Sequence, residues 1–166
     1  MSEQLRIILI IIVSVSIFGL LIFVFVKNYI KNKINYYLNI KNSVKQKLTC
    51  HCKNVEIDVK LTNGLNDLYR CNCSMCKRKG TIIAIVPKKN LEIVKGQKNI
   101  TFYQFNTNVA KHFFCNVCGI STHSQRRSDP NTYGINMGCI DDIEVNELFK
   151  FKTFINDGQN HIKDRK

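Results

Sequence analysis

Residues 71–76 read Cys71-Asn72-Cys73-Ser74-Met75-Cys76 and place three cysteines within six positions. Residues two apart on a strand point to the same face, so the sulfur atoms of Cys71 and Cys73 can meet at one ion. The short step to Cys76 turns the chain back toward them. The segment therefore predicts a metal site with three thiolate ligands.

Two further cysteine groups flank this segment. Upstream lies Cys50-His51-Cys52, whose two sulfur atoms can face one ion in the same way, and downstream lies Cys115-Asn116-Val117-Cys118-Gly119. The glycine permits the positive φ that such a tight turn often needs. Seven of the eight cysteines thus fall into three groups. This grouping is typical of zinc, which favours thiolates in tetrahedral geometry.

The number of grouped cysteines predicts two zinc ions per chain. A structural zinc has four protein ligands, whereas a catalytic zinc has three and one open position. The simplest partition assigns Cys50, Cys52, Cys115 and Cys118 to a structural zinc, and Cys71, Cys73 and Cys76 to a second, open zinc. The alternative is two structural sites, the second completed by Cys139 or a histidine. Cys139 is distant in sequence and is expected to be a buried small residue.

The sequence around these groups predicts a mostly β domain. Val55, Ile57, Val59 and Leu61 alternate with polar residues, as in a half-buried strand. Residues 81–86 and 100–105 are further candidate strands, and Asn63-Gly64 and Lys95-Gly96 are candidate turns. A short final strand is expected near residues 149–155, followed by a loose tail.

The amino-terminal segment predicts one transmembrane helix. Residues 7–26 are apolar except Ser14, Ser16 and Gly19, and none is charged. Twenty helical residues span roughly 30 Å, the thickness of the hydrocarbon core of a bilayer. A cleaved signal peptide is the alternative, but a small-residue cleavage site does not follow the run.

The flanking charges predict the orientation of this helix. Glu3 and Arg6 precede the run, whereas residues 27–47 contain six lysines and no acidic residue. The positive-inside rule therefore places the carboxyl-terminal domain in the cytosol, where free thiolates are also favoured over disulfides. The basic segment is expected either to lie on anionic lipid, with Ile30, Ile34 and Leu38 as an apolar stripe, or to be a solvated linker or a frayed continuation of the helix.

The net charge of +13 gives little support to nucleic-acid binding. About half of the excess positive charge lies in the segments that flank the apolar run. Zinc-bound thiolates would lower the positive charge of the remaining domain further. In addition, aromatic and basic residues do not alternate as a base-stacking surface requires. The composition therefore argues against nucleic acid as a partner.

The order Cys-x-Cys, Cys-x-Cys-x-x-Cys and Phe-Cys-x-x-Cys-Gly resembles the glutathione-dependent formaldehyde-activating enzymes and their relative, centromere protein V. The resemblance covers about Leu48 to Val145 and is closest to the centromere protein V branch. Five segments resemble that branch: Cys73-Ser74-Met75-Cys76-Lys77-Arg78-Lys79, Phe105-Asn106-Thr107, Ser128-Asp129-Pro130, Tyr133-Gly134-Ile135 and Cys139-Ile140-Asp141.

The resemblance implies a small antiparallel β fold, the β-tent, which is related to the Mss4-like fold. It also implies a structural zinc on the first and third cysteine groups, a catalytic zinc on the second, and carbon–sulfur lyase activity. The family usually has glycine around Cys-x-Cys, where this chain has Leu48, Thr49 and Lys53. This departure leaves the ligands intact but can alter the local turn.

Two functions follow as hypotheses. An open zinc with three thiolate ligands can bind a small thiol such as glutathione and lower its pKa. Together with the resemblance, this predicts a carbon–sulfur lyase that acts on thiol–aldehyde adducts similar to S-hydroxymethylglutathione. The alternative is a noncatalytic zinc-binding module of the centromere protein V type, with a protein partner.

Several other side chains are candidates for supporting roles. Five cations either pair with the carboxylates of a glutathione-like substrate or form a solvated surface: Lys77, Arg78, Lys79, Arg126 and Arg127. His112 and His123 are either hydrogen-bond partners or proton carriers at the site, or ordinary structural histidines. His51 is expected to point away from its neighbouring ligands.

These interpretations divide the chain into five parts. Residues 1–6 are a short extracytosolic terminus, 7–26 the transmembrane helix and 27–47 the basic juxtamembrane linker. Residues 48–155 form the zinc-binding domain and 156–166 a polar tail. The sequence thus predicts a single-pass membrane protein whose zinc domain faces the cytosol.

Overall fold

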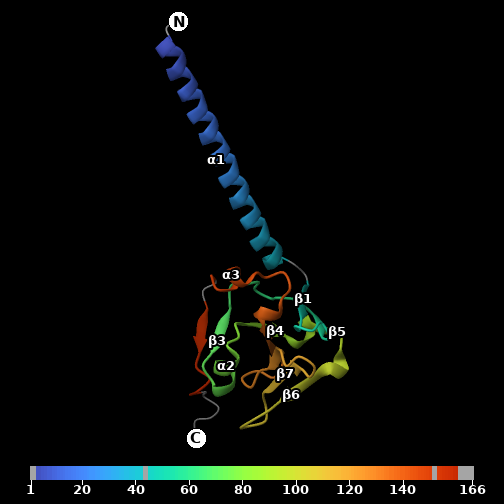
Figure 1. The fold of residues 1–166 in the computed structure, drawn as a ribbon. Helices are drawn as coiled ribbons and strands as arrows, with labels where there is room; N and C mark the ends of the chain where they lie inside the picture. Colours follow the sequence, from blue (N-terminus) through green and yellow to red (C-terminus); the bar gives the residue numbers. More distant parts are fainter. Residues whose placement is uncertain (1–2, 43–44, 151–152, 161–166) are drawn as a thin grey trace. The chain divides into compact units, whose positions relative to one another are not determined.

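The computed structural model describes residues 3–42, 45–150 and 153–160, without the side chains of Leu9 and of residues 35–42. The chain forms two compact units, Met1–Asn39 and Ile40–Lys166. The first consists of the long helix α1 (Glu3–Asn42), which continues into the second unit, and the second unit is mostly β (Figure 1).

Helix α1 is longer than the apolar run, because it continues through most of the segment expected as a linker. By length and composition Glu3–Ile34 can cross a membrane, a property it shares with signal sequences. The hydroxyls of Ser14 and Ser16 donate to the carbonyl oxygens of Ile11 and Ile12, both over 2.8 Å, so these polar groups are satisfied within the helix. Of the predicted stripe, Ile30 and Ile34 are exposed, and the side chain of Leu38 lies outside the described residues.

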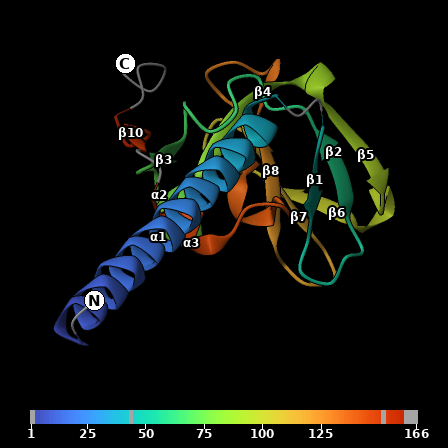
Figure 2. The same cartoon turned by 90° about the horizontal axis from the view of Figure 1, so that it is seen from above.

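The second unit contains two sheets. One has three strands in the order β1-β2-β5, and the other has seven in the order β10-β3-β4-β9-β8-β7-β6 (Figures 1 and 2). The strands are β1 (Gln46–Thr49), β2 (Glu56–Val59), β3 (Tyr69–Cys71), β4 (Ile83–Pro87), β5 (Leu91–Lys95), β6 (Ile100–Tyr103), β7 (Lys111–Cys115), β8 (Ser121–Gln125), β9 (Thr132–Asn136) and β10 (Phe154–Asn156). The predicted mostly β class is confirmed.

The alternating apolar residues of the first sheet form part of the core. Val55, Ile57 and Val59 are fully buried, and Leu48 on β1 pairs with Ile57 on β2. β4 overlaps the predicted strand at residues 81–86 and extends one residue beyond it, to Pro87. β6 falls within the predicted strand at residues 100–105. At the predicted turn after β5, Gly96 has a positive φ of 80°.

The helices of the second unit are short. They are α2 (Ser74–Lys79), α3 (Val145–Leu148) and the 3-10 turns η1 (Lys88–Asn90), η2 (Gln97–Asn99) and η3 (Met137–Cys139). The final strand differs from the expectation, because Phe149 caps α3 and β10 begins at Phe154. β10 pairs in parallel with β3, the strand that leads into the central cysteine group.

Candidate functional site

Four cysteines from distant parts of the sequence form one cluster, the four-cysteine cluster. The Sγ atoms of Cys50, Cys52, Cys115 and Cys118 all lie within 4.8 Å of one another. The Cys50 and Cys52 Sγ atoms are 3.6 Å apart, and those of Cys52 and Cys115 are 3.7 Å apart. Cys50 and Cys115 are buried. This donor set fits a metal ion such as zinc with a full set of thiolate ligands.

The first turn of this cluster follows β1. The Cys50 N–H donates to the Val55 carbonyl over 3.1 Å, and the Lys53 N–H donates to the Cys50 carbonyl over 2.9 Å. The Val55 N–H in turn donates to the Cys50 Sγ over 3.3 Å. Backbone donors of this kind stabilise a thiolate. The turn therefore shapes the ligand pair, and its Val55 donor acts to stabilise the Cys50 thiolate.

The second turn follows β7 and has the same design. The Gly119 N–H donates to the Cys115 carbonyl over 2.8 Å, and the Val117 N–H donates to the Cys115 Sγ over 3.4 Å. Gly119 has a φ of 74°, as the sequence indicated. The two turns thus present their sulfur atoms to each other from the ends of strands in different sheets.

The thiols of this cluster differ in pKa because their surroundings differ. Burial raises the pKa of Cys50 to about 11, although its hydrogen bond from Val55 acts in the opposite direction. For Cys118, burial also acts to raise the pKa, but the N–H groups of Cys52 and Ile120 bring it down to about 6. The backbone donors around Cys118 therefore favour its thiolate more than the surroundings of Cys50 do.

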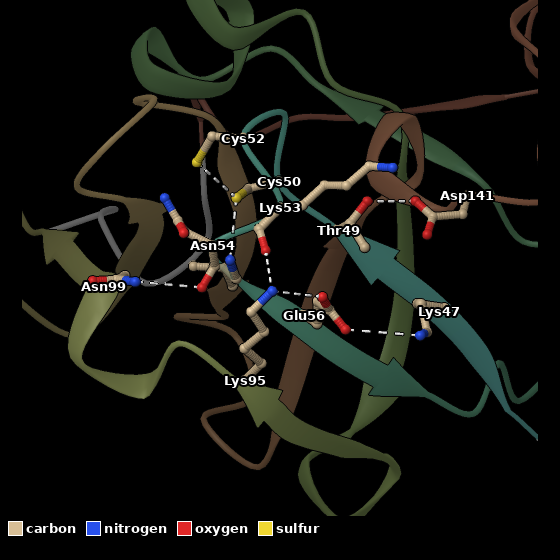
Figure 3. Close-up of polar contacts among 11 residues, drawn as sticks. Lys47, Thr49, Cys50, Cys52, Lys53, Asn54, Glu56, Lys95, Asn99 and Asp141 are labelled. Atoms are coloured by element: carbon tan, nitrogen blue, oxygen red, sulfur yellow. Dashed lines mark hydrogen bonds and ion pairs between the residues drawn. The ribbon is translucent and has the colours of Figure 1, made fainter.

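Lys53 stands where the resemblance noted in the sequence leads us to expect glycine, yet the turn is preserved. Its φ is 57°, in the left-handed region. The Lys95 ammonium donates to the Lys53 carbonyl over 2.9 Å and to Glu56 over 3.0 Å, and Glu56 also pairs with Lys47 at 3.7 Å (Figure 3). These contacts hold Lys53 in the left-handed conformation, which is unfavourable for a residue with a side chain.

Lys53→Gly is therefore expected to stabilise the protein by about 1 kcal/mol, because glycine adopts the left-handed conformation without a steric penalty. The contact from Lys95 uses the Lys53 backbone and survives the change. Chemical denaturation of both proteins measures the difference. Lys60→Gly, at an exposed site just after β2, is the control and should instead lower the free energy of unfolding. Equal destabilisation by both changes would contradict the interpretation.

The remaining grouped cysteines form the three-cysteine cluster. Cys71 ends β3, Cys73 caps the amino terminus of α2 and Cys76 lies within α2, and their Sγ atoms lie within 4.8 Å of one another. The Cys76 N–H donates to the Cys73 Sγ over 3.4 Å. The pKa of Cys73 is lowered, first by hydrogen bonds from Cys71 and Cys76 and further by backbone N–H groups. These sulfur atoms can also hold a metal ion.

Residues 154–160 cover the three-cysteine cluster, and we refer to them as the strap. The Gly158 and Gln159 N–H groups donate to the Asn72 Oδ1 over 2.7 and 3.0 Å. The Asn72 amide donates to Asp157 over 3.1 Å, a contact that is the main cause of the lowered pKa of that carboxyl. A Cβ on Gly158 would lie 2.5 Å from the Cys71 Sγ. The described part of the expected tail is therefore ordered against the site.

A cavity of about 390 Å³ opens beside this cluster. All three cysteines of the three-cysteine cluster lie in the wall of this cavity, together with Arg126, Arg127 and residues of the strap. The full lining is Tyr69, Cys71, Cys73, Ser74, Cys76, Ile83, Phe105, Asn106, Thr107, Ala110, His112, Ser124, Gln125, Arg126, Arg127, Ser128, Asn156, Gly158 and Gln159. The cavity has room for a small ligand with both apolar and anionic groups.

The candidate supporting residues fall into two groups. Arg126, Arg127 and His112 line the cavity, whereas Lys77 and Arg78 are exposed and outside the described lining. Lys79 is turned inward, with its Nζ 3.2 Å from the His112 Nδ1.

Two other candidate residues lie in the interior of the domain. Cys139 is buried as expected, and its Sγ contacts the Asn136 amide and the Ser121 carbonyl. His123 is buried and stacked on Phe113, with ring centroids 4.4 Å apart.

Sequence reasoning missed Asn72 and Gly158. Both act through backbone or amide contacts between segments far apart in the chain, for which the sequence carries no periodic signal. The position of Asn72 between two expected ligands was the only available hint.

The comparisons with known proteins agree with this geometry. The family model for the glutathione-dependent formaldehyde-activating enzyme matches residues 45–155. A protein of Emericella nidulans, provisionally named as such an enzyme, is 26% identical over 83 residues, which cover 48% of this chain and 42% of that protein. The chain thus spans less than half the length of this curated relative. A crystal structure of a Rhodobacter sphaeroides protein is 45% identical, has a TM-score of 0.63 and covers 66% of this chain and 99% of its own. The match to more than half of the chain shows that this protein belongs to the glutathione-dependent formaldehyde-activating enzyme family.

Proposed function

We propose that the protein is a zinc-dependent carbon–sulfur lyase that forms and cleaves adducts of a small thiol with formaldehyde, such as S-hydroxymethylglutathione. One observation carries this proposal. All three sulfur atoms of the three-cysteine cluster belong to residues in the cavity wall, whereas none of the four-cysteine cluster is among the described lining residues. A cluster with three ligands beside a cavity suits substrate binding, and a cluster with four ligands away from it suits a structural role.

The two clusters would each hold one zinc ion, with Cys50, Cys52, Cys115 and Cys118 at the structural site and Cys71, Cys73 and Cys76 at the other. When bound by three thiolates, zinc supplies a Lewis acid that lowers the pKa of a substrate thiol. The family membership supports this assignment, and the Mss4-like β-tent is the fold that we propose for the two sheets. Placement in the centromere protein V branch stays a prediction.

The chain's own residues bind and orient the substrate. Arg126 and Arg127 provide planar cations that match the carboxylates of glutathione. Arg126 is positioned by its donation to the Thr132 Oγ1 over 3.2 Å. Phe105 gives the cavity an apolar wall, and the strap limits access of water from the side of Cys71.

We further propose that α1 anchors the protein as a single-pass membrane protein with the second unit in the cytosol. Its apolar length, the exposure of its side chains and the lysines that follow support this placement.

The function is tested with the full-length chain in detergent, loaded with zinc. Glutathione and ¹³C-formaldehyde equilibrate slowly by themselves, and exchange spectroscopy measures the rate in both directions. The protein is expected to accelerate exchange without changing the equilibrium, and metal analysis should give two zinc ions per chain. Full zinc loading without acceleration would favour the alternative, a noncatalytic interaction module.

Arg127→Gln is expected to raise the KM for S-hydroxymethylglutathione by about 10-fold with little change in kcat, because one charge-assisted contact to a carboxylate is lost. Exchange kinetics measure both constants. Lys77→Gln removes the same charge from an exposed position and should leave KM unchanged. A second control uses 2-mercaptoethanol, which has no carboxylate. An equal rise in KM for this thiol would show that Arg127 does not act on the carboxylates.

A further inference from the structure

We propose that His112 is a catalytic residue of this site and donates a hydrogen bond from Nε2–H to the substrate oxygen, with Lys79 as the residue that positions it. This inference rests on the proposed function and assigns to that site a donor for the oxygen of the aldehyde or hydroxymethyl group. It is carried by three features: the place of His112 in the cavity wall, its contact with Lys79 and its packing against Phe105.

The contact with Lys79 fixes which ring nitrogen carries the proton. The Lys79 Nζ lies 3.2 Å from the His112 Nδ1 and 3.2 Å from the Ser121 Oγ. A lysine ammonium has donors and no acceptor, so Nδ1 must accept. The proton of the neutral ring therefore resides on Nε2. His112 is among the described lining residues of the cavity and Lys79 is not, so of this pair the imidazole ring is the group that a bound substrate can contact.

The surroundings of His112 favour its neutral ring at neutral pH. Burial, and secondly the charge of Lys79, lower the pKa of His112 to about 4, so the ring is neutral. Burial lowers the pKa of Lys79, and the nearby sulfur atoms of Cys76, Cys73 and Cys71 offset part of that effect. Phe105 stacks on the ring at 5.7 Å between centroids and an angle of 20°, which restricts its rotation.

The chemistry of the adduct needs such a donor. As the thiolate sulfur bonds to the aldehyde carbon, the π electrons of the carbonyl move to its oxygen. The Nε2–H group stabilises that charge without losing its own proton. The proton released by the substrate thiol passes to water, and water supplies the proton that completes the hydroxyl group. In the reverse direction the same donor stabilises the oxygen while the carbon–sulfur bond breaks.

The first test needs no turnover. In the full-length chain with ¹⁵N-labelled histidine rings, the His112 resonances are identified by their loss in His112→Phe. We expect Nε2 to be protonated and Nδ1 to be unprotonated at pH 7. A proton on Nδ1 instead, or on both nitrogens, would overturn the proposal whether or not the protein is an active lyase.

The second test uses exchange kinetics. His112→Phe keeps an aromatic ring against Phe105 but no donor, and it should lower kcat by about 100-fold with a smaller change in KM. His112→Gln offers an amide N–H near the position of Nε2 and should recover part of the loss. Wild-type kcat in His112→Phe would overturn the catalytic role.

Two further variants separate positioning from folding. Lys79→Met removes the partner of Nδ1 and is expected to lower kcat by about 10-fold, because the donor is no longer held in place. Lys79→Arg should restore part of the rate. The matched control is His123→Phe, which changes a buried, stacked histidine outside the described cavity lining and should keep wild-type kcat. A wild-type protein without exchange activity would overturn the proposed function and with it this role, while the ring-nitrogen measurement still reports on the Lys79 contact.

Discussion

Cys115→Ser is expected to unfold the β unit, whereas Cys73→Ser should leave it folded. Cys115 is buried and joins the end of β7 to the turn after β1 through the four-cysteine cluster. Binding of a structural zinc ion contributes about 10–16 kcal/mol of apparent free energy in small zinc domains, which is comparable to or exceeds the roughly 5–15 kcal/mol that stabilises a whole domain. A serine cannot replace the thiolate, so most of this stabilisation is lost.

Cys73→Ser should instead have a local effect. Cys73 caps a helix of six residues, and a serine hydroxyl can also accept the hydrogen bond from the Cys76 N–H. The second metal ion is expected to be lost, together with exchange activity, while the sheets remain intact.

Metal analysis and circular dichroism of the full-length chain distinguish the two variants. We expect the wild type to bind two zinc ions, Cys73→Ser one, and Cys115→Ser none in a stable fold. Cys139→Ser, at a residue that lies outside both clusters, is the control and should keep both ions. If Cys73→Ser and Cys115→Ser behave alike, the division into a structural and an open site is wrong.

Gly96→Ala is expected to be the most destabilising change of a single methyl group, with a loss of more than about 3 kcal/mol. A Cβ at this position would lie 1.8 Å from the Asn54 carbonyl oxygen and 2.8 Å from its carbon, and Gly96 has a φ of 80°. Both atoms belong to backbone, so no side-chain rotation relieves the contact. The displaced segment includes Val55, whose N–H donates to the Cys50 Sγ. The affinity of the four-cysteine cluster for zinc should therefore fall as well.

Gly80→Ala is the matched control, because Gly80 also has a positive φ of 63° but, among the described residues, no atom lies within 4 Å of its Cβ position. It should cost about 1 kcal/mol, the penalty for the left-handed conformation alone. Thermal and chemical denaturation measure both variants, and a chelator titration measures zinc affinity. Similar losses for the two glycines would show that the contact with Asn54 is relieved by movement of the loop.

The cysteine spacing indicated which sulfur atoms within one group can meet, but not which groups join each other. Residues two apart on a strand share a face, and a Cys-x-x-Cys-Gly turn brings its two sulfur atoms together, so local geometry determines each half of a cluster. The pairing of Cys50 with Cys115 needed the count of ligands as well. Alternation of apolar residues at Val55, Ile57 and Val59 likewise predicted β2, because one face of that strand is buried.

Other features depend on contacts that spacing does not encode. The close approach of Gly96 to Asn54 and of Gly158 to Cys71 joins backbone segments from separate elements. Lys79 is part of a run of three cations, which usually marks a solvated surface, yet its ammonium lies against His112. The sequence left open whether the basic segment continues the helix, and α1 does extend to Asn42, since exposed lysines do not end a helix.

The strap has a consequence for how the protein matures. Asn72 and Gly158 are 86 positions apart, so the last partner of the three-cysteine cluster leaves the ribosome long after its ligands. All ligands of the four-cysteine cluster are synthesised by Cys118, well before the strap. The two clusters are therefore expected to form in order, because the ligands of the four-cysteine cluster are all synthesised before the strap that covers the three-cysteine cluster. A chain truncated before Phe154 should accordingly keep the four-cysteine cluster but lose the contacts of the strap with Asn72.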